Sequence, residues 1–268
     1  MTRDDRRIEG EGTPEAAWQA WGGLEAMTII THDALVAPHQ HAVIVAPHPD
    51  DETLGFAGLM LKLAEAGHTM RLIAVTDGTA SHAGSTHWSA EHLAQQRPLE
   101  SLEALRRLGC EHQTTVERLG LPDTAVAHHE AALADHLAAR LTVDHVVLTT
   151  WRGDGHPDHE ATGRACAQAC AISGARLIEI PIWSWHWAAP GDPRVPWHQA
   201  RRLRLDADMR SRKQVAIQAH DSQLKVDPDT GQAPILPDHV LTRLTRPYEV
   251  FFIPASHETA TTERRRCS

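Results

Sequence analysis

The sequence lacks several features that would place it in a familiar class. Its 268 residues include no asparagine, so it has no N-glycosylation sequon and no asparagine side chain for catalysis. Its apolar runs are far shorter than the roughly 18–20 residues that span a bilayer, so we expect no membrane insertion. The first ten residues are charged and contain no apolar segment of the kind found in signal peptides, which predicts that the chain is not secreted.

Cysteine and basic residues are also scarce. The four cysteines are too few for a disulfide framework in a chain of this size, which favours a reducing, cytoplasmic location. Cys166 and Cys170 share one face of an expected helix, but no second pair completes a metal site, so buried small side chains are the favoured interpretation. The formal net charge of −9 argues against a general nucleic-acid binder, which needs a basic face.

Between residues 42 and 180, segments typical of strands alternate with segments typical of helices. The expected strands are Ala42–Ala46, Arg71–Thr76, Thr115–Leu119, His145–Thr149 and Arg176–Ile180, and the expected helices are Thr53–Ala66, Ala90–Leu108, Glu130–Leu141 and His159–Ser173. This alternation predicts an α/β fold with a doubly wound, mostly parallel, Rossmann-like sheet and helices on both faces. In the strand order 3-2-1-4-5, the first and fourth strands are neighbours, and a site is expected beyond their carboxyl ends.

The flanking regions are less regular. We expect an N-terminal extension over residues 1–38 with a helix at Thr13–Ala26, a single domain over residues 39–256, and a flexible tail over residues 257–268. After residue 181 we expect a helix at Leu205–His220 and a last strand at Glu249–Ile253. The tryptophan-rich segment Trp183–Trp197 suits either the wall of a sugar site or a packing role, as a lid against the core or a subunit contact.

The first cluster of chemically active residues directly follows the first expected strand, in the segment Pro47–Glu52. His48 and Asp51 are three residues apart and can converge on one metal ion, because zinc accepts neutral imidazole nitrogen and carboxylate oxygen. Asp50 lies between them and can point toward a water molecule on the metal. The alternative is an ordinary helix N-terminus, at which Asp50 and Asp51 complement the helix dipole.

A second cluster, Gly155–His159, follows the fourth expected strand. His159 can supply a third ligand, and His156 can face the open side of the ion. Either histidine alone would more often be a surface or helix-capping residue, but two such clusters on adjacent strands favour one shared metal site. Zinc is the expected metal, and two histidines with one carboxylate also suit Fe²⁺.

These motifs resemble those of a known family. The segment Ala46–Glu52 (APHPDDE) resembles the A-H-P-D-D-E signature of the PIG-L/LmbE de-N-acetylases, and His156–His159 resembles their H-P-D-H motif. Weaker similarities cover Thr76–Gly78, Arg97 with Glu100, Gly120–Asp123, and Lys213 with His220–Gln223. The resemblance extends over roughly residues 40–225.

The resemblance implies a role for each residue of the site. It implies that His48, Asp51 and His159 bind the metal and that Asp50 is the general base. It implies that His156 stabilises the oxyanion, as a protonated imidazole, and helps the amine to leave.

It further implies that Arg97 and Asp123 hold sugar hydroxyls. Two alternatives stay open for them: Arg97 would form a surface ion pair with Glu100 or Glu103, and Asp123 would be a turn residue. Some family members have a tyrosine at the position of Asp154, so any contribution of a phenol is lost here.

The resulting hypothesis is a metal-dependent hydrolase that removes the N-acetyl group from an N-acetylglucosamine-containing small molecule or glycoconjugate. Its expected partners are Zn²⁺, with Fe²⁺ as an option in cells, and a small N-acetyl amino-sugar substrate. A homo-oligomer is left open. Two other functions also stay open: a non-catalytic sugar-binding homologue, and a metal hydrolase of another amide or ester. Dinucleotide binding is disfavoured because no G-x-G-x-x-G follows the first strand.

Overall fold

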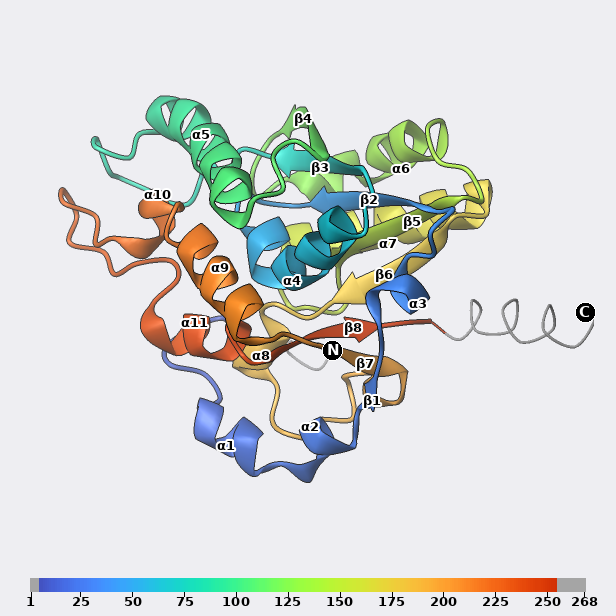
Figure 1. Cartoon of the computed structure of the whole chain (residues 1–268). Coiled ribbons are helices and arrows are strands. Elements are labelled where there is room, and N and C mark those ends of the chain that lie inside the picture. The colour runs from blue at the N-terminus through green and yellow to red at the C-terminus, as the bar shows by residue number, and fades with distance from the viewer. Residues whose placement is uncertain (1–4, 255–268) are drawn as a thin grey trace, which may run out of the picture.

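The computed structural model describes residues 5–254, in which eight strands form one sheet (Figure 1). The strands are β1 (Thr28–Ile29), β2 (His41–Ala46), β3 (Met70–Thr76), β4 (Thr114–Leu121), β5 (His145–Thr150), β6 (Arg176–Ile180), β7 (Ala200–Arg204) and β8 (Tyr248–Phe252). Their order across the sheet is β1-β7-β8-β6-β5-β2-β3-β4. All neighbouring pairs are parallel except those that involve β8.

Helices pack on both faces of this sheet. They are α1 (Glu15–Ala20), α2 (Gly22–Ala26), α3 (His32–Leu35), α4 (Asp51–Glu65), α5 (Ala90–Leu108), α6 (Glu130–Ala138), α7 (Pro157–Ser173), α8 (Ser184–Trp187), α9 (Ala207–Ile217), α10 (Asp221–Leu224) and α11 (Asp238–Leu244), with short 3-10 turns at Val126–His129 and Trp197–Gln199. Helices α4, α5 and α9 pack together on one face, and α6 and α7 pack together on the other (Figure 1).

The two-sided core explains why most positions of the central strands are apolar. Successive side chains of a strand point to opposite faces. In β2, Ile44 packs into the core beneath α4, whereas Val43 and Val45 pack into the core beneath α6 and α7. The predicted doubly wound sheet with helices on both faces is therefore confirmed.

The strand order β4-β3-β2-β5-β6 is the predicted order 3-2-1-4-5 for the first five strands of the alternating region. Strands β2 and β5 run parallel and side by side, with Val45 opposite Thr149. The segments that follow them, which contain the two His-Pro-Asp clusters, therefore leave the sheet at the same edge.

Strand β7 was not predicted. Its sequence, Ala-Arg-Arg-Leu-Arg, lacks the apolar alternation of a half-buried strand. Arg202 is nevertheless buried. Its guanidinium lies 5.5 Å from the centroid of the Tyr248 ring and donates a hydrogen bond to the Glu25 carbonyl. This strand and β1 extend the sheet past the antiparallel β8.

The prediction of one helix over Thr13–Ala26 was wrong. The structure has two short helices, interrupted at Trp21, whose backbone is extended. Gly22 and Gly23 follow directly, and glycine is a poor helix former. Trp18 is fully buried and packs edge-on against Trp185 at 5.0 Å. The domain boundary at residue 38 stays a prediction, and the predicted tail lies outside the described residues.

Several other helix boundaries differ from those expected. The helix expected at Leu205–His220 ends at Ile217, and a separate turn, α10, begins at Asp221. The helix expected to begin at His159 begins at Pro157. Within residues 5–254, no helix is long and apolar enough to cross a membrane.

Candidate metal centre and active site

The three predicted metal ligands present their atoms to one point. His48 Nδ1 lies 3.3 Å from His159 Nε2 and 3.4 Å from Asp51 Oδ2, and His159 Nε2 lies 3.3 Å from the same oxygen. Ligands at about 2.0–2.1 Å from a tetrahedral zinc are about 3.3–3.4 Å apart, so this triangle matches one face of such a site. The fourth, open position is the one at which a catalytic zinc keeps its water.

Second carboxylates set the tautomer of each histidine. His159 Nδ1 donates to Asp154 Oδ2 at 2.9 Å, and His48 Nε2 donates to Asp158 Oδ2 at 3.2 Å. Each ring therefore directs its unprotonated nitrogen toward the centre of the triangle. Two imidazole lone pairs facing each other at 3.3 Å repel unless a cation or a proton lies between them, which supports a metal site.

The charges of the site favour a cation. Burial opposes the charged form of each group, yet His159 and His48 hold the pKa of Asp51 far below its usual range. Burial likewise opposes protonation of His159, but Asp51 and Asp154 raise its pKa to about 9. The carboxylates around the two rings thus attract positive charge, and a divalent ion would supply it.

The donor atoms also allow other ligand sets. His156 groups with His48 and His159, and Asp123 and Asp158 group around His48, with ligand atoms within 4.8 Å of one another in each set. His156 Nδ1 accepts a hydrogen bond from the Asp158 backbone N–H at 3.2 Å, as the cap of α7. The compact triangle of His48, Asp51 and His159 is therefore the better site, and His156 lies beside it.

Asp50 directly precedes α4, and its backbone conformation is strained. Its φ is 146°, a region that favours glycine, and such residues cluster at functional sites. Burial raises the pKa of its carboxyl to about 7, although Arg97, with Nη2 3.5 Å from Asp50 Oδ2, acts in the opposite direction. A carboxylate with a pKa near neutrality suits general acid–base catalysis.

The surroundings of His156 favour the neutral form of its imidazole. Burial lowers the pKa of its imidazole to about 3, and the neighbouring His159 and His48 act in the same direction. Because Nδ1 accepts from the Asp158 N–H, the proton of the neutral ring is on Nε2. His156 can therefore donate a hydrogen bond to an oxyanion, whereas its transfer of a proton to an amine is disfavoured.

All seven predicted site residues line a single pocket of about 660 Å³, measured with its open mouth. This volume lies within the roughly 300–1,000 Å³ typical of small-molecule sites. Other parts of its wall come from α4 and α10, from the loops after β3, β4 and β6, and from the loop before α11. The residues concerned are Leu54, Ala80, Ser81, Thr124, Ile182, Trp183, Gln223, Ile235 and Leu236.

Arg97 is not the surface residue that one interpretation allowed. Only 2% of it is exposed, and its guanidinium donates to the carbonyls of Gly78 and Pro49 at 2.9 and 3.0 Å. A Cβ at residue 78 would lie 1.6 Å from Arg97 Nη1, so glycine is required there. By contrast, Leu99 and Leu102 of α5 are exposed, whereas Leu105 and Leu108 of the same helix are buried.

Asp123 sits at the pocket wall with both oxygens engaged. Oδ2 accepts from the Ala80 N–H at 2.7 Å, and Oδ1 lies 3.4 Å from His48 Nε2. It therefore helps to hold both the loop after β3 and the ring of His48. Its contact with a sugar hydroxyl stays a prediction, as does that of Arg97.

The tryptophan-rich segment divides between the two roles considered for it. Trp183 lines the pocket. Trp185 is buried and meets Trp18 and Trp197 at 5.0 and 5.8 Å between ring centroids. The segment is thus partly pocket wall and partly core.

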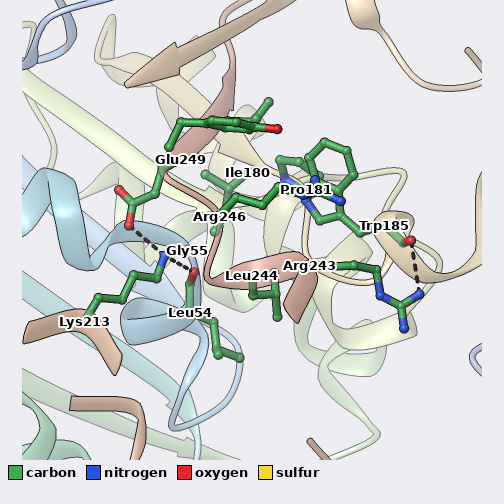
Figure 2. A pocket seen from close by; sticks show the side chains of 12 residues that line it. Leu54, Gly55, Ile180, Pro181, Trp185, Lys213, Arg243, Leu244, Arg246 and Glu249 are labelled. Atoms are coloured by element: carbon green, nitrogen blue, oxygen red, sulfur yellow. Dashed lines mark hydrogen bonds and ion pairs between the residues drawn. The ribbon is translucent and has the colours of Figure 1, made fainter. Parts of the chain in front are cut away.

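Sequence reasoning missed two groups of supporting residues. Asp154 is fully buried and accepts from the backbone N–H groups of residues 182–184 as well as from His159. The backbone N–H groups that Asp154 accepts from lie 28–30 residues further along the chain, so no local sequence pattern reveals them. The second group, Lys213 and Glu249, lies beneath α4 (Figure 2).

Comparison with known proteins agrees with this geometry. The family described as PIG-L, GlcNAc-PI de-N-acetylase, matches residues 43–170, which contain both histidine clusters. Residues 43–170 of this chain are thus similar to the PIG-L family. The predicted family resemblance is thereby confirmed.

Two curated relatives of this protein are named as deacetylases. One, the 1D-myo-inositol 2-acetamido-2-deoxy-alpha-D-glucopyranoside deacetylase of Mycobacteroides abscessus, is 26% identical over 230 residues, covering 70% of this chain and 82% of that protein. The other, "Probable N-acetyl-alpha-D-glucosaminyl L-malate deacetylase 2" of Bacillus anthracis, is 28% identical over 201 residues, covering 69% and 81%.

Among solved structures, the N,N'-diacetylchitobiose deacetylase of Pyrococcus horikoshii superposes with a TM-score of 0.52 and 21% identity, covering 80% of each chain. This similarity supports the shared fold.

Proposed function

We propose that this protein is a zinc-dependent hydrolase that removes the acetyl group from an N-acetylglucosamine-containing small molecule. The observation that carries the proposal is the triangle of His48, Asp51 and His159, with edges of 3.3–3.4 Å, at the floor of a pocket that also contains Asp50. A non-catalytic homologue would have no need of a strained, buried carboxyl with a pKa near neutrality beside a metal site.

The residues divide the chemistry of amide hydrolysis among them. Bound in the triangle, zinc would supply Lewis acidity and lower the pKa of a water molecule. Asp50 takes a proton from the attacking water and returns it to the leaving amine, which its pKa of about 7 allows in both directions. His156 donates its Nε2–H to the oxygen of the amide carbonyl as negative charge develops there. The products are acetate and a free amine.

The pocket offers groups for the sugar on both sides of the metal site. Asp123 and Arg97 provide polar atoms on the side of β3 and β4, and Trp183 provides an aromatic face on the side of β6. The named activities of the curated relatives, which act on acetylated glucosamine linked to inositol or malate, support an N-acetylglucosamine conjugate here too. A cytoplasmic location and a homo-oligomer stay predictions, and Fe²⁺ stays an alternative metal.

The experiment is to purify the wild type and Asp50→Ala, measure bound zinc, and assay acetate release from a panel of N-acetylglucosamine conjugates. We expect about one zinc per chain in both proteins and acetate from the wild type only. Zinc binding without acetate release from any conjugate would redirect the search to other amides or esters. Failure of the wild type to bind metal on titration would refute the proposal.

A further inference from the structure

A buried ion pair contacts the helix that carries the catalytic aspartates. Lys213 on α9 is 1% exposed, and its Nζ donates to the Leu54 carbonyl at 2.7 Å and to Glu249 Oε1 at 2.8 Å (Figure 2). Glu249 lies on β8 and is 5% exposed. Burying two charges is costly unless their hydrogen bonds are satisfied, so a pair placed here indicates a specific role.

Both residues of the ion pair hydrogen-bond the backbone of α4. Glu249 accepts from the N–H groups of Gly58 and Leu59 at 2.8 and 3.0 Å, while Lys213 binds the Leu54 carbonyl. In a regular α-helix the N–H of residue 58 pairs with the carbonyl of residue 54. The ion pair thus hydrogen-bonds the Gly58 N–H and the Leu54 carbonyl, two groups that an isolated helix would pair only with each other.

Glycine makes this approach feasible. A Cβ at residue 58 would lie 2.2 Å from Leu205 Cδ2 and 3.1 Å from Glu249 Oε2. At residue 55 it would lie 1.7 Å from Ile180 Cδ1. Helix α4 therefore presents a bare backbone surface, and the neighbouring strands and α9 close upon it.

The Leu54 peptide links this pair to Asp50. The Leu54 N–H donates to the Asp50 carbonyl at 2.8 Å, and the Leu54 carbonyl accepts from Lys213. Leu54 also lines both the small cavity of about 300 Å³ beside Lys213 and the active-site pocket. Lys213 is thus two hydrogen bonds from the strained backbone of Asp50.

We propose that Lys213, held by Glu249, is a positioning residue that fixes the first turn of α4 and thereby the orientation of Asp50 and Asp51. The inference rests on the proposed function for its catalytic consequence. It also accounts for the weak similarity noted at Lys213 and His220–Gln223. In the same segment, His220 Nε2 lies 3.3 Å from Thr53 Oγ1, so a second residue contacts the same turn.

The test compares Lys213→Met with the conservative variant Lys213→Arg and with a matched control, Arg246→Met. Arg246 belongs to another buried ion pair, with Glu15, at 2.8 Å, and its guanidinium lies 4.2 Å from the Trp185 ring centroid. Its guanidinium hydrogen-bonds Glu15 on α1 and not the α4 backbone, although Arg246 lines the same small cavity as Leu54. For each protein we would measure the melting temperature, the zinc dissociation constant by chelator competition, kcat and KM for acetate release, and amide hydrogen exchange at residues 51–55.

We expect both methionine variants to lose stability. Only Lys213→Met should weaken zinc binding about tenfold, lower kcat about 10–100-fold with little change in KM, and accelerate exchange at residues 51–55. Lys213→Arg should recover part of the loss in kcat and zinc affinity. If Lys213→Met does not fold, Glu249→Gln is measured by the same criteria.

Zinc affinity and exchange rates equal to those of Arg246→Met would overturn the proposal, because Lys213 would then only stabilise the fold. If the wild type released no acetate from any conjugate, the proposed function would fail. The zinc affinity and exchange at residues 51–55 would still decide the positioning role on their own.

Discussion

At the scale of single residues, the site depends on carboxyl groups in four different surroundings. Asp51 forms one corner of the triangle with His48 and His159, Asp154 and Asp158 hydrogen-bond those histidines, and Asp50 is held in a strained conformation next to Arg97. Their environments separate their protonation behaviour, since burial raises the pKa of Asp50 to about 7 while His159 and His48 keep that of Asp51 low. In the proposed function, aspartate side chains thus act as ligand, orienting partner and base.

The strain at Asp50 allows its catalytic and structural effects to be separated. We expect Asp50→Ala and Asp50→Gly to lower kcat about 10²–10⁴-fold while they retain zinc. Because glycine adopts positive φ without strain, Asp50→Gly should be more stable than Asp50→Ala by about 1 kcal/mol. Urea unfolding of the two variants measures this difference. Equal stabilities would show that the φ of 146° is not a strained feature.

Asp154 should act through His159 and not through substrate. Asp154→Asn keeps the size of the side chain but weakens its acceptance of the His159 Nδ1–H, so zinc affinity should fall about 10–100-fold. Chelator competition measures this change. Glu130→Gln is a suitable control, since Glu130 pairs with Arg164 at the surface at 2.8 Å. An unchanged zinc dissociation constant in Asp154→Asn would contradict the assignment.

At the scale of elements, α4 combines a functional N-terminus with a closely packed body. Its first turn presents Asp50 and Asp51, while Gly55 and Gly58 allow β6, β8 and α9 to approach its backbone. The helix is buried along nearly its whole length, unlike α5, which exposes Leu99 and Leu102. The position of the catalytic turn therefore depends on how this helix packs.

Gly55→Ala tests that dependence. The added methyl would lie 1.7 Å from Ile180 Cδ1, so β6 or α4 must move. Overpacking of this kind costs about 1–3 kcal/mol, and the shift should also lower kcat. Gly22→Ala, where nothing lies within 4 Å of the added carbon, is the control and should be nearly neutral. Thermal unfolding and acetate release together measure the outcome, and an unaffected Gly55→Ala would refute close packing at this position.

At the scale of the whole molecule, one buried histidine makes stability depend on pH. His220 is fully buried, and burial lowers the pKa of its imidazole to about 3, with Arg97 acting in the same direction. The unfolded chain binds a proton on this group below about pH 6.5, whereas the folded chain does not. The stabilisation that comes from keeping His220 neutral is therefore fully present above pH 6.5 and is lost as the pH falls from 6.5 toward 3.

We expect this group alone to cost about 2 kcal/mol of unfolding free energy at pH 5. His220→Gln should flatten the dependence of stability on pH between 6.5 and 4. Urea unfolding of chelated protein across this range is the measurement, because chelation removes the pH dependence of metal binding from the comparison. His112→Gln, at a side chain that is 88% exposed, should leave the slope unchanged. Identical slopes for His220→Gln and wild type would contradict the expected effect.

The features readable from the sequence were those that depend on local pattern. Strand and helix alternation predicted the doubly wound sheet, because apolar runs of strand length and helical periodicity are local signals. The same reading predicted the adjacency of β2 and β5, which brings together His48 and His159. The seven site residues predicted from two motifs and the family resemblance all line one pocket.

Long-range packing decided the rest. Asp154 finds its N–H donors at residues 182–184, and Lys213 finds Glu249 across the interface of α9 with β8, at separations that no local pattern encodes. Arg97 is buried because hydrogen bonds to the Gly78 and Pro49 carbonyls replace the water that a guanidinium would otherwise require. On the same helix, Leu99 and Leu102 are exposed. The sequence by itself therefore determined which residues line the pocket, and the tertiary structure determined which residues hold them there, since support depends on contacts that form only when distant elements pack.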